Sequence, residues 1–202
     1  MLDLLFPNNP LRKEDWDSIP IAPYIALQRE LTSMGLGSLD RLLSATRYHD
    51  SAILQRTISL YKYQKMFGLS NPLAMLIVQA SLPYVHDDIM LVPVPLHFSR
   101  YVSRGFNQAV LLARRISAMT GLPMKRLLRR TKNTGHQAWR SRYERMESIR
   151  DSFALSYFVH TVPMHVVLID DIATTGATLD ACADVLKRSG VQRVDAWVIA
   201  RA

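Results

Sequence analysis

The stretch VVLIDDIATTGATL, residues 166–179, contains the strongest fold signal in the chain. Its first four residues are apolar and mostly β-branched, which predicts a short buried strand. Two aspartates follow, then a run of small and hydroxylated residues, and then the start of a helical pattern. A strand, a loop and a helix in this order are typical of a parallel α/β sheet. Such sheets bind ligands at the carboxyl ends of their strands, so this loop is the predicted ligand site.

The parts of this loop suit the parts of a sugar phosphate. Two adjacent carboxylates can accept hydrogen bonds from a pair of vicinal hydroxyls. Small side chains let backbone N–H groups approach an anion, and the N-terminus of the following helix favours phosphate. The alternative is an ordinary turn in which Thr178 only caps the helix. The candidate substrate-binding residues are Asp170, Asp171, Ala173, Thr174, Thr175, Gly176, Ala177 and Thr178.

Strand and helix patterns alternate through the second part of the chain. They predict strands at residues 88–96, 165–170 and 193–200, with helices at residues 107–120 and 179–189. Two shorter strands are predicted at residues 124–128 and 152–158. Asn107, at the start of the first helix, is a candidate both for its N-cap and for a ligand contact.

Residues 1–85 contain helical patterns and no predicted strand. Helices are predicted at residues 23–34, 38–48, 51–66 and 72–82, and Asn71 is the predicted N-cap of the last one. The predicted fold class is therefore α/β. A parallel-sheet domain spans residues 86–202, and a mostly helical N-terminal region, residues 1–85, forms a cap.

The stretch at residues 166–179 resembles the 5-phosphoribosyl-1-pyrophosphate signature of type I phosphoribosyltransferases. A second block is the strand VPVPL at residues 92–96, followed by Arg100 and by RGFNQ at residues 104–108. Together the two blocks are similar to the ComF/GntX family. Weaker matches are Lys62, in a lysine–tyrosine element, and the more widely spaced Thr131, Gln137 and Arg145.

The resemblance implies a type I phosphoribosyltransferase fold and, as activity, phosphoribosyl transfer to a base or amine. It places Asp170 and Asp171 on the ribose hydroxyls and the loop at residues 173–178 on the 5-phosphate. It places Arg100 and Arg104 on the pyrophosphate, and it makes Arg104 and the two aspartates the candidate catalytic residues. Mg²⁺ is expected to arrive with the substrate, because it prefers phosphate oxygens and waters. No residue identifies the acceptor.

Members of this family commonly begin with paired cysteines that look like a zinc ribbon. Cys182 is the only cysteine in this chain, so the ribbon is absent and no zinc is expected. Cys182 itself lies in a predicted helix and is expected to be a small core residue. A second departure is Ser148, where the family often has asparagine.

The net charge of +8 is concentrated in one segment. Residues 97–150 carry 13 basic and 2 acidic side chains, whereas the segments on either side are close to neutral. Three interpretations stay open: a mobile lid over the active site at residues 131–148, a nucleic-acid surface with Trp139 and Tyr143 for stacking, or a solvated face. The resemblance adds an alternative function, a non-catalytic accessory protein of DNA uptake (competence) that binds DNA and works beside a helicase-type ATPase.

No apolar run approaches the length of a membrane span, and the apolar N-terminal run is too short for a signal peptide. A single cysteine suits a reducing compartment. These features predict a cytoplasmic protein without a membrane span.

Overall fold

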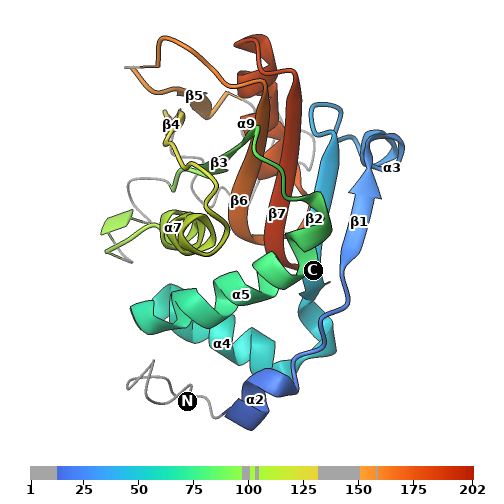
Figure 1. The fold of residues 1–202 in the computed structure, drawn as a ribbon, viewed down its shortest axis with the longest axis vertical. Coiled ribbons are helices and arrows are strands. Elements are labelled where there is room, and N and C mark those ends of the chain that lie inside the picture. Colours follow the sequence, from blue (N-terminus) through green and yellow to red (C-terminus); the bar gives the residue numbers. More distant parts are fainter. Residues whose placement is uncertain (1–12, 97–100, 103–104, 132–150, 158) are drawn as a thin grey trace, which may run out of the picture.

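The computed structural model describes residues 13–96, 101–102, 105–131, 151–157 and 159–202. A five-stranded sheet with the strand order β1-β2-β7-β6-β3 lies at its centre (Figure 1). All neighbouring strands are parallel except β1, which runs antiparallel to β2. The predicted α/β class is confirmed. The five strands are β1 (Tyr24–Leu27), β2 (Arg41–Arg47), β3 (Ile89–Pro93), β6 (His165–Ala173) and β7 (Arg193–Arg201).

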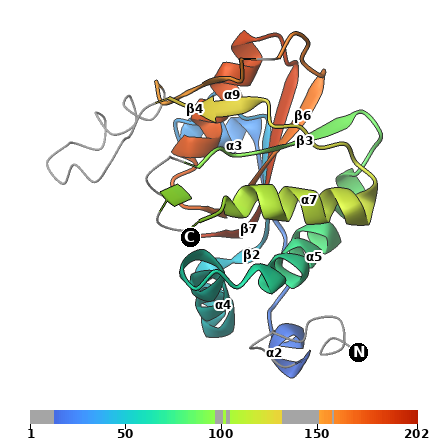
Figure 2. The same cartoon turned by 90° about the vertical axis from the view of Figure 1, so that its left-hand side faces the viewer.

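Helices cover both faces of the sheet. On one face lie α4 (Ala52–Tyr63), α5 (Ser70–Ser81) and α7 (Gln108–Thr120), and on the other lie α3 (Gln28–Ser33) and α9 (Ala177–Arg188), as Figure 2 shows edge-on. The remaining elements are α2 (Lys13–Asp17), the 3-10 helices η1 (Tyr48–Asp50), η2 (Phe67–Leu69) and η3 (Leu82–Tyr84), and a small antiparallel pair, β4 (Leu128–Arg130) with β5 (Phe153–Leu155).

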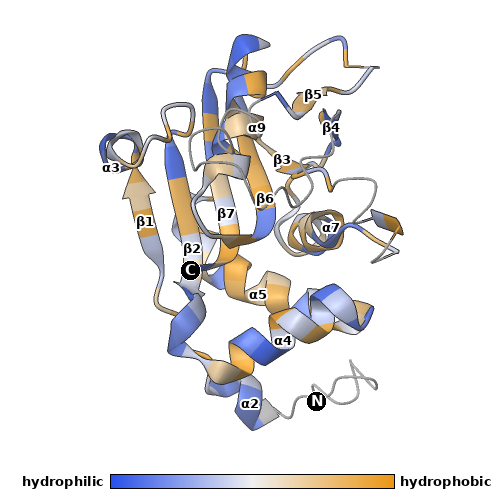
Figure 3. Ribbon diagram, turned by 180° about the vertical axis from the view of Figure 1, so that it is seen from behind, coloured by the Kyte–Doolittle hydropathy of each residue, from blue (hydrophilic) through white to orange (hydrophobic). Residues whose placement is uncertain are grey.

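The core has two halves, one on each face of the sheet. Alternate residues of β6 divide between them: Val167 and Ile169 pack under α5 and α7, whereas Val166 and Leu168 pack under α9. Burial on both faces makes β6 mostly hydrophobic (Figure 3). Cys182 is fully buried in α9 as predicted, and burial raises the pKa of its thiol, which therefore stays protonated.

The prediction of helices alone in residues 1–85 is wrong for two segments. Residues 24–27 form β1, and residues 41–47, predicted as part of a helix, form β2. β2 is buried from Leu42 to Thr46 because the two halves of the core cover both of its faces, so it lacks the alternation that marks a half-buried strand. The central sheet therefore takes strands from both sides of residue 85, although α4 and α5 are helical as predicted.

Helix ends follow local signals in some places and not in others. Asn107 caps α7, because its side chain accepts hydrogen bonds from the N–H groups of Ala109 (2.9 Å) and Val110 (3.4 Å). Asn71 is not an N-cap, since α5 already begins at Ser70. The predicted lid at residues 131–148 lies, beyond Thr131, outside the described residues, as do Gln137, Trp139, Tyr143, Arg145 and Ser148. No helix in the described ranges is long and apolar enough to cross a lipid bilayer.

Candidate functional site

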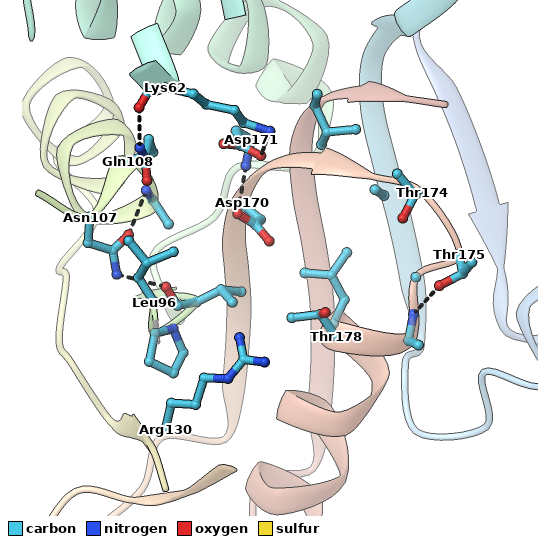
Figure 4. Close-up of a pocket in the computed structure, with 18 residues that line it drawn as sticks. Lys62, Leu96, Asn107, Gln108, Arg130, Asp170, Asp171, Thr174, Thr175 and Thr178 are labelled. Atoms are coloured by element: carbon cyan, nitrogen blue, oxygen red, sulfur yellow. Dashed lines mark hydrogen bonds and ion pairs between the residues drawn. The ribbon is translucent and has the colours of Figure 1, made fainter. Parts of the chain in front are cut away.

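A pocket of about 250 Å³ opens where β3 and β6 end. Lys62, Leu96, Asn107 and Arg130 lie along one side of it, three threonines lie along the other, and the two aspartates lie between them (Figure 4). Every predicted substrate-binding residue from Asp170 to Thr178 lines this pocket. The residues predicted from this one stretch of sequence therefore all lie around a single cavity.

The two aspartates have different surroundings. β6 continues to Ala173, three residues beyond the predicted end, so Asp170 and Asp171 lie inside a strand and belong to opposite faces of the sheet. An Asp170 carboxylate oxygen accepts a hydrogen bond of 2.9 Å from the N–H of Asp171, and this side chain is partly exposed. Asp171 is buried and forms an ion pair with Lys62, with 2.9 Å between Nζ and Oδ1.

Lys62 reaches this position because α4 is tied to the start of α7. The Tyr61 hydroxyl donates a hydrogen bond of 2.9 Å to the Gln108 carbonyl, and the Gln108 amide donates one of 3.4 Å to the Lys62 carbonyl. Burial, reinforced by the charge of Asp171, raises the pKa of Tyr61, so the phenol stays a neutral donor. The sequence singled out Lys62 by resemblance but did not predict its pairing with Asp171.

The loop at residues 173–178 is a compact turn that ends at the first residues of α9. Gly176 is the N-cap residue of α9 and has a φ of 76°, so Thr178 lies inside the helix and is not its N-cap. The Thr175 hydroxyl accepts a hydrogen bond of 3.4 Å from the Ala177 N–H. Thr178 and Leu179 lie in the first turn of α9. N–H groups in a first turn have no acceptor within the helix and can bind an anion.

A second segment holds this turn from behind. The carboxylate of Asp180, buried in α9, accepts hydrogen bonds from the N–H groups of Ser38 (2.8 Å) and Leu39 (3.3 Å). Leu36 packs so closely on Gly176 that a β-carbon there would lie 2.5 Å from a Leu36 methyl group. The backbone of the turn is therefore fixed by residues far away in the sequence.

Asn107 and Gln108 line the opposite wall. The Gly105 N–H donates a hydrogen bond of 2.6 Å to the Tyr101 carbonyl, and Phe106 is a core residue packed against the rings of Tyr61 and Phe67. The Asn107 amide donates a hydrogen bond of 3.0 Å to the Val94 carbonyl. Arg100 and Arg104 lie outside the described residues.

Removing the positive charge of Lys62 should destabilise the protein through Asp171. Lys62→Met leaves the Asp171 carboxylate buried without its ion-pair partner, which should lower the free energy of unfolding by about 1–3 kcal/mol. In Lys62→Met with Asp171→Asn the loss should be smaller than the sum of the single losses, as measured by urea titration. Arg188→Met breaks an exposed ion pair with Asp184 and serves as the control, with an expected loss of about 0.5 kcal/mol. Equal losses in Lys62→Met and Arg188→Met would contradict the coupling.

Several known proteins are similar to this chain. A model of the phosphoribosyl transferase domain matches residues 102–202. Competence protein F of Haemophilus influenzae is 30% identical over 179 residues, which cover 82% of this chain and 74% of that protein. DNA utilization protein YhgH of Salmonella typhimurium is 28% identical over 167 residues, which cover 80% and 72%. The purine phosphoribosyltransferase of Pyrococcus horikoshii aligns at 15% identity and a TM-score of 0.41, over 66% of this chain and 82% of that one.

Proposed function

We infer, because the chain belongs to the ComF family of proteins with a phosphoribosyltransferase domain, that its pocket binds 5-phosphoribosyl-1-pyrophosphate. One observation carries the proposal: Asp170, Asp171 and a turn at a helix N-terminus line the same cavity. Carboxylates accept hydrogen bonds from sugar hydroxyls, and a helix N-terminus favours a phosphate group. A site for a sugar phosphate needs the carboxylates and the helix N-terminus close enough for one ligand to reach both.

In this proposal the ligand lies across the pocket. Asp170 and Asp171 accept hydrogen bonds from the ribose hydroxyls, and the turn from Ala173 to Thr178 binds the 5-phosphate. Lys62 supports the site by holding Asp171 in place. The pyrophosphate is assigned to Arg100 and Arg104, because a guanidinium group can donate two parallel hydrogen bonds to phosphate oxygens.

The reaction class that fits this ligand is transfer of the phosphoribosyl group to a nitrogen nucleophile. A bond forms from the nucleophile to C1 of the ribose, the bond from C1 to the pyrophosphate oxygen breaks, and the proton of the nucleophile passes to solvent. The oxygens of Asp170 and Asp171 suit Mg²⁺ brought in by the substrate, since this ion prefers oxygen ligands and retains waters. Bound Mg²⁺ would neutralise charge on the departing pyrophosphate.

Release of pyrophosphate tests the transfer. The full chain is incubated with labelled phosphoribosyl pyrophosphate, Mg²⁺ and a panel of nucleobases and amines. Release that depends on one acceptor, with the label recovered on that acceptor, supports an enzyme. Tight binding without release, across the whole panel, would make this a ligand-binding protein on the same fold.

A second candidate function is DNA handling in the cytoplasm, beside a helicase-type ATPase, without phosphoribosyl transfer. Its support is a basic cavity of about 440 Å³ next to the ligand pocket, in addition to the names that the two relatives carry. The exposed residues Arg114 and Arg126 line it, with the half-exposed ring of Tyr101. The Arg129 guanidinium lies 4.1 Å from the centre of the exposed Tyr157 ring. Basic side chains mixed with aromatic rings are typical of surfaces that bind single-stranded nucleic acid.

The DNA proposal predicts salt-sensitive binding that depends on this cavity. Arg114→Gln with Arg126→Gln should weaken binding at low salt. It should also reduce the slope of log affinity against log salt concentration by about 1.4 on single-stranded DNA, or about 0.7 for each lost phosphate contact. Arg29→Gln with Arg56→Gln removes the same charge from exposed positions outside the basic block and should have little effect. Gel-shift titrations at several salt concentrations measure both. Identical slopes in the two double variants would contradict a role for the cavity.

A further inference from the structure

Three potential metal ligands meet at the edge of the sheet opposite the pocket. His86 and Asp88 lie in the turn before β3, and His165 is the first residue of β6. β3 and β6 are parallel neighbours in which Ile89 is paired with His165, so their amino ends coincide. Each of the three side chains offers one ligand atom, and these atoms lie within 4.8 Å of one another. The ring centres of the two histidines are 5.0 Å apart.

The buried histidine of this cluster is already held in place by a carboxylate. His165 is almost fully buried, and its Nε2 forms a hydrogen bond of 3.2 Å with a carboxylate oxygen of Asp195. Asp195 is buried as well and accepts two hydrogen bonds from the Arg193 guanidinium, at 3.2 and 2.9 Å. A carboxylate behind one ring nitrogen orients a histidine whose other nitrogen binds a metal, as in many zinc sites. This second layer distinguishes the cluster from a chance grouping of surface side chains.

We propose that His86, Asp88 and His165 bind a divalent transition metal ion of the Zn²⁺ class. Two imidazoles and one carboxylate suit Zn²⁺, Co²⁺ or Ni²⁺ better than Mg²⁺ or Ca²⁺, which prefer ligand sets made only of oxygen. His86 Nδ1 and Asp88 Oδ1 hydrogen-bond to one another, and the ion would replace the proton that they share. The site uses no thiolate and is therefore different from the cysteine ribbon that the chain lacks.

The position of the site determines how tightly it holds the metal ion and which property of the protein the bound ion changes. His86 and Asp88 have exposed side chains, so the ion exchanges with solvent, and dialysed protein should carry none. When bound, the ion joins the turn before β3 to the start of β6. This is the amino end of the two strands, and the pocket lies at their carboxyl end. Its effect should therefore be on stability, because a ligand that binds only the folded state raises the unfolding temperature.

The test uses the full chain after treatment with a chelator. Co²⁺ binding is followed by visible absorption and Zn²⁺ binding by calorimetry, and one ion per chain is expected. His86→Gln and Asp88→Asn should each weaken binding at least about tenfold and abolish the Zn²⁺-induced rise in unfolding temperature. Both residues are exposed, so these variants should fold, whereas a substitution of the buried His165 would also break its hydrogen bond to Asp195 in the core.

His49→Gln is the matched control. His49 is exposed and lies beside Asp50, as His86 lies near Asp88, but it is outside the cluster. This variant should bind the ion with unchanged affinity. Absence of binding by the wild-type chain, or equal affinity in the wild type, His86→Gln and Asp88→Asn, would overturn the proposal. So would a loss in His49→Gln as large as the loss in His86→Gln.

Discussion

Replacing Asp170 and Asp171 together with asparagine should weaken binding of phosphoribosyl pyrophosphate by at least about 100-fold. Each carboxylate is proposed to accept hydrogen bonds from the ribose, and a hydrogen bond to a charged group contributes about 1.5–3 kcal/mol. Two such losses amount to about 3–6 kcal/mol, and about 1.4 kcal/mol corresponds to a factor of ten in affinity. Calorimetric titration with the ligand and Mg²⁺ measures the change.

The design must separate lost binding from lost folding, because Asp171 pairs with Lys62. Asp170→Asn alone keeps this ion pair, so it should reduce affinity without a large change in unfolding temperature. Asp184→Asn, on α9 outside the pocket, removes the same charge and should leave affinity unchanged. Unchanged affinity in a folded double variant would remove the two aspartates from the ligand site.

The parts of this fold that the sequence predicted are those with local signals. β6 was recognised from its run of branched apolar residues, and α7 was recognised from its period and its Asn107 cap. β2 was mistaken for a helix because both of its faces are buried, by packing with helices that the sequence does not mark as its neighbours. A segment buried on both faces carries no periodicity that distinguishes strand from helix.

The same contrast, between features with a local sequence signal and features that depend on distant contacts, holds for the site. The loop at residues 173–178 was predicted residue by residue, since its small side chains and the helix after it are contiguous. The ion pair of Lys62 with Asp171 was not, because it depends on how α4 packs against α7. The packing of Leu36 on Gly176 was also missed, since it joins two segments of the same face that are far apart in the sequence. Contacts between side chains of distant segments leave no pattern in a single sequence.

Gly176→Ala should lower both the affinity for phosphoribosyl pyrophosphate and the stability of the fold. Gly176 has a φ of 76°, a left-handed conformation that costs a residue with a β-carbon about 1–2 kcal/mol. The new β-carbon would also meet the Leu36 methyl group at 2.5 Å, so either Leu36 or the turn must move. Movement of the turn displaces the N–H groups assigned to the 5-phosphate, and affinity should fall at least about tenfold, the equivalent of one charge-assisted hydrogen bond.

Gly121→Ala separates the two causes. Gly121 ends α7 with a φ of 77°, nearly that of Gly176, but its β-carbon would meet nothing within 4 Å and it lies outside the pocket. It should therefore lose about 1–2 kcal/mol of stability from backbone strain alone and keep full affinity. Leu36→Ala added to Gly176→Ala relieves the collision but not the strain, so it should recover part of the affinity. If Gly176→Ala lost no more stability than Gly121→Ala and bound the ligand normally, close packing behind the turn would have no part in phosphate binding.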